Sequence, residues 1–188
     1  MNDFNLKFGI IGIDHRHVYT QAQFLIELGA ELVGWYTEGS PTTLGGFTKR
    51  FPKAKRFTDP RSLLEDPDIK VILTSAVPND RAKISISAMK HGKDVMSDKP
   101  GCLSFGELEE LRQTVQQTGR IWSVDFSERF EVPAVTLASQ LVSDGAIGDV
   151  IHTLGLGPHR LNPESRPNWF FDPNQNGGIL ADIGSHQI

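Results

Sequence analysis

The sequence has a single cysteine, Cys102, among its 188 residues. One thiol cannot form a disulfide within the chain, so a fold held together by disulfides is excluded. No apolar run reaches the length of a membrane span, and Met1 to Lys7 lack the apolar core of a secretion signal. These absences favour a cytoplasmic protein. Cys102 is expected to be a small residue at the edge of the core, because no neighbour in the sequence would activate it as a nucleophile.

Clusters of basic residues are lacking as well. Lys and Arg number 19 against 23 Asp and Glu, and the net charge of −4 is spread along the chain. A surface for nucleic acid or for an anionic membrane needs concentrated positive charge, so neither is expected as a partner. The hydrophobic share of 38% and the charged share of 22% are ordinary for a globular protein with a hydrophobic core.

Strand-like apolar runs alternate with helical patterns through the first two thirds of the chain. Strands are expected over residues 6–11, 31–36, 55–57, 70–76, 94–97 and 121–126, and helices over 18–29, 61–64, 79–91 and 105–118. Gly45 and Gly46 argue against a helix over residues 41–51. This alternation predicts an α/β fold with a doubly wound parallel sheet of Rossmann type, which forms a dinucleotide-binding domain over residues 1–126.

The rhythm changes after Phe126. A helix is expected around residues 133–143, then one strand over 149–156, then a long polar and aromatic loop, and finally the start of a helix over 177–188. Residues 127–188 are therefore expected to be the incomplete beginning of an α+β substrate domain.

The first strand–helix turn is a candidate phosphate-binding loop. Such a loop uses glycines at three positions, and here Gly12 supplies the tight turn while Asp14 and His17 occupy the other two. A carboxylate beside a phosphate is repulsive unless its side chain turns away, although Arg16 could offset the repulsion. A plain turn and a cofactor loop both remain open. As a cofactor loop, the contacts would come from Gly9, Gly12, Ile13, Asp14 and His15.

Asp14, His15 and His17 also raise the question of a metal site. Two histidines two positions apart can reach one ion if the backbone is extended. The sequence offers no companion cluster of ligands, so no metal is expected.

Thr37 and Glu38 end the second expected strand, where a dinucleotide-binding sheet often places an acid for the ribose hydroxyls. Threonine would suit either cofactor, whereas Glu38 favours NAD over NADP. No arginine follows immediately to bind a 2′-phosphate. The alternative for Glu38 is a solvated loop acid.

Two further strand ends carry candidate ligand contacts, because a sheet of this type binds ligands at its carboxyl edge. Ala76, Pro78 and Asn79 follow the fourth expected strand, and Asp98 and Lys99 follow the fifth. A lysine there can donate a hydrogen bond to a substrate hydroxyl or to the nicotinamide ribose. A lone lysine after a strand is otherwise simply solvated.

Near the end of the sequence, Asp182 and His186 are four residues apart, so on a helix they would share one face. Such a pair suits proton transfer from an alcohol: the imidazole takes the proton while the carboxylate orients the ring. An exposed Asp–His pair on a helix surface is the alternative.

The loop before this pair mixes aromatic and basic residues, as sites for hydroxyl-rich ligands often do. The candidate substrate contacts are His159, Arg160, Arg166 and Trp169. Alternatively, the two arginines pair with Glu164 and Asp172 while Trp169 covers the core.

Taken together, these motifs resemble the Gfo/Idh/MocA oxidoreductases, named after glucose–fructose oxidoreductase and inositol dehydrogenase. The resemblance runs from about Lys7 to the last residue. It rests on residues 9–12 (GIIG), Pro78-Asn79, Asp98-Lys99-Pro100 in place of Glu-Lys-Pro, residues 145–148, and Gly177, Gly178, Asp182, Gly184 and His186. This chain departs from the family pattern at Asp14 and His17, which stand where the family has glycines.

The resemblance implies a function. Lys99, Asp182 and His186 would act together, with His186 as general base and Lys99 contacting both substrate and cofactor, NAD or NADP. The reaction would transfer a hydride between the nicotinamide and a secondary alcohol of a sugar, cyclitol or related polyol. The alternative is a catalytically silent sensor or co-regulator of the same fold that binds a sugar or nucleotide, which the altered glycine pattern favours.

Members of that family are longer than this chain, continue into a sheet that covers the site, and form homo-oligomers. The resemblance therefore implies that the sequence is the N-terminal part of such a protein. Alone, it is expected to expose an apolar face, to associate with itself and to show little turnover.

Overall fold

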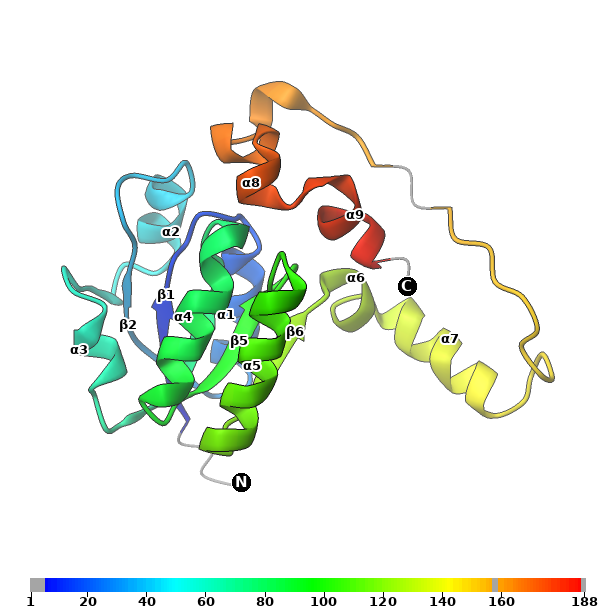
Figure 1. The fold of residues 1–188 in the computed structure, drawn as a ribbon, viewed down its shortest axis with the longest axis horizontal. Coiled ribbons are helices and arrows are strands. Elements are labelled where there is room, and N and C mark those ends of the chain that lie inside the picture. Colours follow the sequence, from blue (N-terminus) through cyan, green and yellow to red (C-terminus); the bar gives the residue numbers. More distant parts are fainter. Residues whose placement is uncertain (1–5, 157–158, 187–188) are drawn as a thin grey trace.

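The computed structural model describes residues 6–156 and 159–186 and contains one six-stranded sheet of order β3-β2-β1-β4-β5-β6 (Figure 1). Every neighbouring pair of strands is parallel. The strands are β1 (Lys7–Ile11), β2 (Glu31–Tyr36), β3 (Lys55–Arg56), β4 (Ile69–Thr74), β5 (Asp94–Asp98) and β6 (Trp122–Asp125). The predicted Rossmann-type doubly wound sheet is confirmed.

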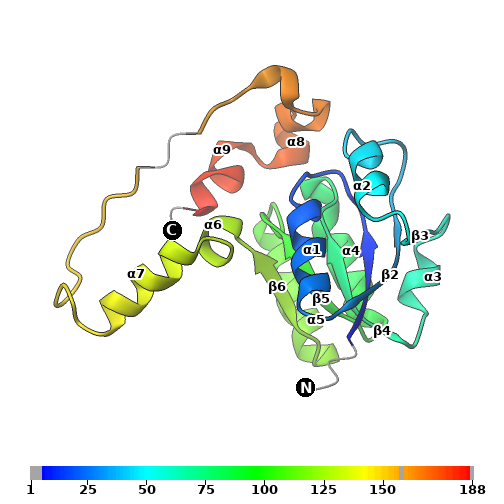
Figure 2. The ribbon, with the colours of Figure 1, turned by 180° about the vertical axis from the view of Figure 1, so that it is seen from behind.

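Helices cover both faces of the sheet, as Figure 1 and the reverse view in Figure 2 show. These helices are α1 (Val18–Glu27), α2 (Leu44–Arg50), α3 (Arg61–Leu64), α4 (Pro78–Lys90) and α5 (Phe105–Thr118). Helix α5 begins at a capping box of Ser104 and Glu107 and ends at Gly119, whose φ is +64°. Its ends are thus encoded locally.

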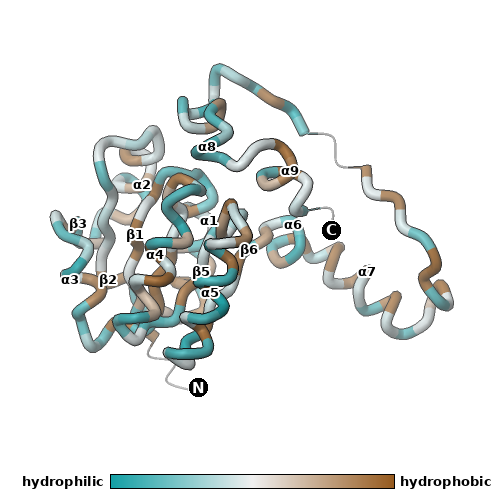
Figure 3. Tube along the Cα trace, in the orientation of Figure 1, coloured by the Kyte–Doolittle hydropathy of each residue, from teal (hydrophilic) through white to brown (hydrophobic). Residues whose placement is uncertain are grey.

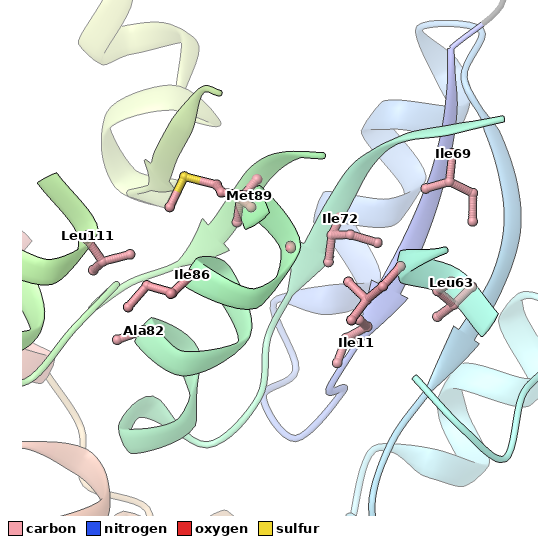
Figure 4. Close-up of a cluster of buried hydrophobic side chains, with 11 residues drawn as sticks. Ile11, Leu63, Ile69, Ile72, Ala82, Ile86, Met89 and Leu111 are labelled. Atoms are coloured by element: carbon pink, nitrogen blue, oxygen red, sulfur yellow. The ribbon is translucent and has the colours of Figure 1, made fainter. Parts of the chain in front are cut away.

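Two apolar cores lie on opposite faces of the sheet because successive strand residues point to opposite sides. Ile11 and Ile72 pack with Ile86, Met89 and Leu111 under α3, α4 and α5 (Figure 4). The other core, beneath α1 and α2, consists of Phe8, Ile10, Ile13, Val18, Ala22, Ala30, Trp35, Phe47, Phe51 and Leu73.

Helix α2 was not expected, because it contains Gly45 and Gly46. A Cβ at Gly46 would lie 2.5 Å from the hydroxyl oxygen of Tyr19. That hydroxyl donates a 2.9 Å hydrogen bond to the carbonyl of Thr43, at the start of α2. Close packing against Tyr19 therefore accounts for Gly46 within a helix.

Residues after the sheet form a long excursion and a return. Helices α6 (Ser127–Phe130) and α7 (Pro133–Ser143) lead away from the sheet, and the chain comes back so that α8 lies against α4 (Figure 1). The returning part contains η1 (Pro163–Ser165), η2 (Asn168–Phe171), α8 (Pro173–Asn176), α9 (Gly178–Asp182) and η3 (Gly184–His186). We call residues 127–186, as far as they are described, the C-terminal segment.

The strand expected over residues 149–156 is absent, so that prediction was wrong. The backbone there is irregular, and Ile151 and Leu154 keep 95% and 77% of their surface exposed. Figure 3 shows these hydrophobic stretches on the outer loop that follows α7. A strand needs a neighbour to satisfy its backbone groups, and no strand in the described part of the chain lies beside it.

The helix expected over residues 177–188 is also different. Two short pieces, α9 and η3, replace one continuous helix, and residues 187–188 lie outside the described residues. Of the helices in the described ranges, none is long and apolar enough to cross a membrane.

Candidate functional site

The turn after β1 lies at the carboxyl edge of the sheet, between β2 and β4. Gly12 donates its N–H to the carbonyl of Tyr36 at 2.8 Å, and its own carbonyl accepts from Ser75 at 3.1 Å. Its φ is +83°, and a Cβ there would lie 2.4 Å from the Cβ of Ala76. Gly12 therefore makes the expected tight turn, and only glycine fits it. Gly9 lies within β1, where a Cβ would crowd Leu63 at 3.2 Å.

Beside this turn is a hollow of about 500 Å³. Its wall includes Gly12 and Ala76 and three acids, Asp14, Glu38 and Asp80. Burial raises the pKa of Asp14 to about 6, and the charges of Asp80 and Glu38 act in the same direction. Pro78 starts α4 and is buried, and Asn79 next to it is exposed. The hollow is thus strongly acidic at neutral pH.

Two expected cofactor contacts point elsewhere. The side chain of Ile13 is fully buried in the core under α1, and its carbonyl accepts a hydrogen bond from the Thr43 hydroxyl. The side chain of Thr37 is also buried, and its Oγ1 has no hydrogen-bond partner among the described residues. Neither side chain faces open space, so Ile13 could contact a ligand only through its backbone.

Asp98 ends β5 and is fully buried. Its carboxylate accepts hydrogen bonds from His15 Nδ1 at 2.8 Å and His17 Nδ1 at 2.9 Å, and it forms an ion pair with Arg81 at 3.0 Å. Burial alone would raise the pKa of Asp98, but Arg81 and both histidines hold that pKa well below its usual range. The side chain of Asp98 therefore faces the interior and its own partners rather than a ligand.

His15, His17 and Asp98 are also the one group of potential metal ligands found among the described residues, with ligand atoms within 4.8 Å of one another. The carboxylate in this group is that of Asp98 and not, as the sequence suggested for a metal site, that of Asp14. A metal would have to displace two hydrogen bonds and lie near the buried Arg81 guanidinium, which repels a cation. The cluster is better described as a hydrogen-bonded network.

Lys99 meets the C-terminal segment directly after the fifth strand. Its Nζ lies 2.7 Å from Asp182 Oδ1 and donates a 2.8 Å hydrogen bond to the Asp182 carbonyl. Lys99 is buried, and the Arg81 guanidinium donates a hydrogen bond to its backbone carbonyl. The structure therefore brings together two predicted catalytic residues that are 83 positions apart.

His186 lies in the same region but faces a different acid. Its Nδ1 is 2.6 Å from Glu128 Oε2, an ion-pair distance without hydrogen-bond geometry, and Phe126 contacts the ring edge-to-face. Burial lowers the pKa of His186, the Lys99 charge lowers it further, and Glu128 opposes both. Because α9 stops at Asp182, the expected i, i+4 pairing on one helix does not form.

Glu128 was missed by the sequence analysis. Only its position could have indicated it: it follows β6 closely, at the same carboxyl edge as the other strand-end residues.

The substrate-loop residues divide into two pairs. The rings of Trp169 and His15 lie edge-to-face, with their centroids 6.1 Å apart. Trp169 and Arg166 line a second hollow of about 280 Å³, which Asp14 also borders. His159 and Arg160 are exposed. Nη2 of Arg166 lies 3.5 Å from Nδ1 of His159 and 3.5 Å from the backbone carbonyl oxygen of Arg160.

The alternative ion pairs with Glu164 and Asp172 are not formed among the described residues. Arg166 instead stacks on Phe170 at 4.5 Å, and Asp172 caps α8 by accepting from the backbone of Asn174 at 3.0 Å. The arginine side chain is therefore held over the loop that carries Trp169.

The chain matches two family profiles. Residues 6–126 match the Gfo/Idh/MocA profile described as "Oxidoreductase family, NAD-binding Rossmann fold", and residues 135–188 match the "GFO/IDH/MocA C-terminal domain". Together the two matches cover the sheet and most of the C-terminal segment.

Similar proteins include dehydrogenases of sugars and cyclitols. Levoglucosan dehydrogenase of Pseudarthrobacter phenanthrenivorans is 32% identical over 155 residues, a match that covers 80% of this chain and 39% of the relative. The NAD(+)-dependent scyllo-inositol 2-dehydrogenase of Bacillus subtilis is 31% identical over 128 residues, or 68% of this chain and 36% of the relative.

Solved structures give the same picture. An oxidoreductase from Erwinia carotovora atroseptica superposes with a TM-score of 0.93 at 38% identity, over 97% of this chain and 54% of that one. A levoglucosan dehydrogenase in complex with NADH and L-sorbose gives a TM-score of 0.76 at 26% identity, over 97% and 50%. This chain thus spans 36–54% of the length of these four similar proteins.

Proposed function

The chain belongs to the Gfo/Idh/MocA family of NAD(P)-binding oxidoreductases, and from this premise we propose that it is the cofactor half of a polyol dehydrogenase. The reaction would transfer a hydride between a nicotinamide cofactor and a secondary alcohol of a sugar, cyclitol or related polyol. The contact of Lys99 with Asp182 at the carboxyl edge of the sheet is the observation that carries this proposal. The relatives that act on levoglucosan and scyllo-inositol support the substrate class.

The hollow beside Gly12 fits the adenosine half of a dinucleotide, which would be held by the turn residues, Ala76, Glu38 and the start of α4. We assign NAD rather than NADP. Three carboxylates, from Asp14, Glu38 and Asp80, surround this hollow against one cation, Lys83, so a 2′-phosphate would be repelled. Arg166 lines the adjoining hollow together with Asp14, and it would offset part of the Asp14 charge near the diphosphate.

When bound, the nicotinamide supplies the hydride acceptor, and the chain's own residues handle the proton. His186 takes the proton of the substrate hydroxyl at Nε2, because Glu128 faces its Nδ1 and favours a proton there. The Lys99 ammonium donates a hydrogen bond to the same hydroxyl oxygen and steadies its negative charge. Asp182 holds that ammonium in place through its 2.7 Å contact.

The remaining proposals concern binding and organisation. Trp169 and Arg166 would contact the hydroxyl-rich substrate, with His159 and Arg160 at its outer edge. The sheet, residues 1–126, would be one domain, and residues 127–188 the first part of a second. Association into homo-oligomers is proposed for the complete protein.

The rival function is a sensor that binds a nucleotide or a sugar without turnover. Asp14 favours it, because a carboxylate in place of the second glycine weakens the binding of the diphosphate. Lys99, Asp182 and His186 favour the enzyme.

Turnover and binding measured on the same variants separate these functions. In the complete protein, we expect NAD⁺ reduction at 340 nm with at least one member of a panel of inositols, sugars and sugar acids. Lys99→Met should lower turnover by about 10²- to 10⁴-fold while NADH still binds. The control is Lys90→Met, an exposed residue at the end of α4. Binding without turnover across the whole panel would favour the sensor, and binding of neither NADH nor any member of the panel would contradict both functions.

A further inference from the structure

One buried carboxylate fixes two imidazole rings at the carboxyl edge of the sheet. Asp98 accepts a hydrogen bond from Nδ1 of His15 on one oxygen and from Nδ1 of His17 on the other. The backbone N–H of Lys99 donates to the same carboxylate at 2.9 Å. The imidazoles and the backbone of the proposed catalytic lysine thus share one anchor.

This anchoring decides where the protons of the rings lie. An ionised carboxylate only accepts, so each Nδ1 must carry a hydrogen. Burial lowers the pKa of His15 to about 4, so its ring is neutral and its Nε2 holds a free lone pair. Among the described residues, Asp98 alone is hydrogen-bonded to either ring, which leaves both Nε2 atoms available.

The two rings lie where the C-terminal segment returns to the sheet, because His15 contacts Trp169 of that segment. Their side chains keep 12% and 20% of their surface exposed, and the rings lie edge-to-face with centroids 4.0 Å apart. Trp169 is part of the substrate loop. The backbone of Lys99 shares the Asp98 carboxylate with both rings. The pair therefore lies beside both the substrate loop and the proposed catalytic lysine.

We propose that His15 and His17 bind hydroxyl groups of a ligand by accepting hydrogen bonds at their two Nε2 atoms. The inference rests on the proposed function. It gives a binding role to His17, which replaces a glycine of the phosphate-binding loop, and to its neighbour His15. Two acceptor atoms side by side suit neighbouring hydroxyls, and their lone pairs repel phosphate or carboxylate oxygens. Such hydroxyls occur both on the nicotinamide ribose and on a polyol substrate.

Two kinds of replacement at each histidine test the role of Nε2. Asparagine can keep the N–H that meets Asp98 but has no atom at the Nε2 position, whereas glutamine can reach the Nε2 position but loses the donor to Asp98. The variants are His15→Asn, His17→Asn, His15→Gln and His17→Gln. Calorimetry with the 188-residue chain measures the Kd for NADH, then for myo-inositol and for L-sorbose with NADH present.

We expect each asparagine variant to raise the Kd for one ligand class by about fivefold to tenfold, with the melting temperature unchanged. The affected titration, NADH or polyol, identifies the source of the hydroxyls. Affinities kept by the asparagine variants and lost by the glutamine variants would show that the rings serve only to hold Asp98, and would overturn the proposal. If wild type binds NADH and polyol but no variant differs from it, this inference fails and the proposed function stands. If wild type binds neither, both fail.

A zinc titration tests whether the same residues bind a metal instead. Titration with ZnSO₄ after EDTA treatment should show no binding tighter than micromolar. One zinc ion per chain, bound tightly and lost in both asparagine variants, would overturn the hydroxyl proposal in favour of a metal centre at His15, His17 and Asp98.

Discussion

The sheet region, residues 6–126, and the C-terminal segment differ in how they hold their shape. Among the described residues, every buried apolar side chain lies at or before Leu111. The C-terminal segment buries only Asn176, and most of its apolar residues on α7 and in the following loop are exposed. Yet this weakly packed segment delivers Asp182 and His186 to the sheet edge. The cofactor half of the site is therefore built on a rigid core, and the proton-transfer half is held by a few polar contacts.

The largest expected effect is at Asp98, inside the sheet region. Asp98→Ala should lower the free energy of unfolding by about 3–5 kcal/mol, because it leaves the Arg81 guanidinium buried without its counter-ion. Urea denaturation followed by circular dichroism measures the change. The matched control is Asp172→Ala in the C-terminal segment, which removes only the cap of α8 and should leave the main transition in place. Equal losses in the two variants would break the distinction between the regions.

Next in size is a pH effect on cofactor binding, confined to the sheet region. Burial raises the pKa of Asp14 to about 6, with Asp80 and Glu38 adding to the shift and Arg81 opposing it. Above that pH the carboxylate is charged and repels the anionic dinucleotide, so the Kd for NAD⁺ should rise by up to about tenfold between pH 5 and 7.5. Asp14→Asn should bind more tightly at pH 7.5 and lose this dependence. Calorimetry that finds the same slope in the asparagine variant would assign the effect elsewhere.

The smallest effect on stability is expected in the outer loop. Ile151→Lys and Leu154→Lys should change the free energy of unfolding by less than about 0.5 kcal/mol, because both side chains are already exposed. Self-association should decrease, since the substitutions place charges on an apolar surface. Sedimentation velocity measures the association, and denaturation measures the stability. A loss above 1 kcal/mol, or a wild-type chain that is already a clean monomer, would contradict this view of the segment.

Much of the sheet was predictable because each element carries its own local signal, such as the capping box at Ser104. The elements that were missed depend on distant partners. Gly46 fits within α2 because the Tyr19 side chain packs where a Cβ would lie. Residues 149–156 form no strand because no strand in the described part of the chain lies beside them. Local pattern alone could not supply those contacts.

The site divides in the same way. The resemblance to a family indicated Lys99 and Asp182, and the structure brings them into contact. The anchoring of His15 and His17 by Asp98, more than 80 positions away, follows from the order of β1, β4 and β5 in the sheet. A carboxylate's partners at that separation cannot be read from spacing along the chain.

Hydrogen–deuterium exchange with and without saturating NADH tests most directly whether one ligand site joins the two regions. We predict slower exchange in the turn over residues 12–17 and, in the same experiment, in residues 166–186 of the C-terminal segment. Protection of the turn alone, with unchanged exchange over residues 166–186, would contradict this prediction, because the segment would then take no part in the site.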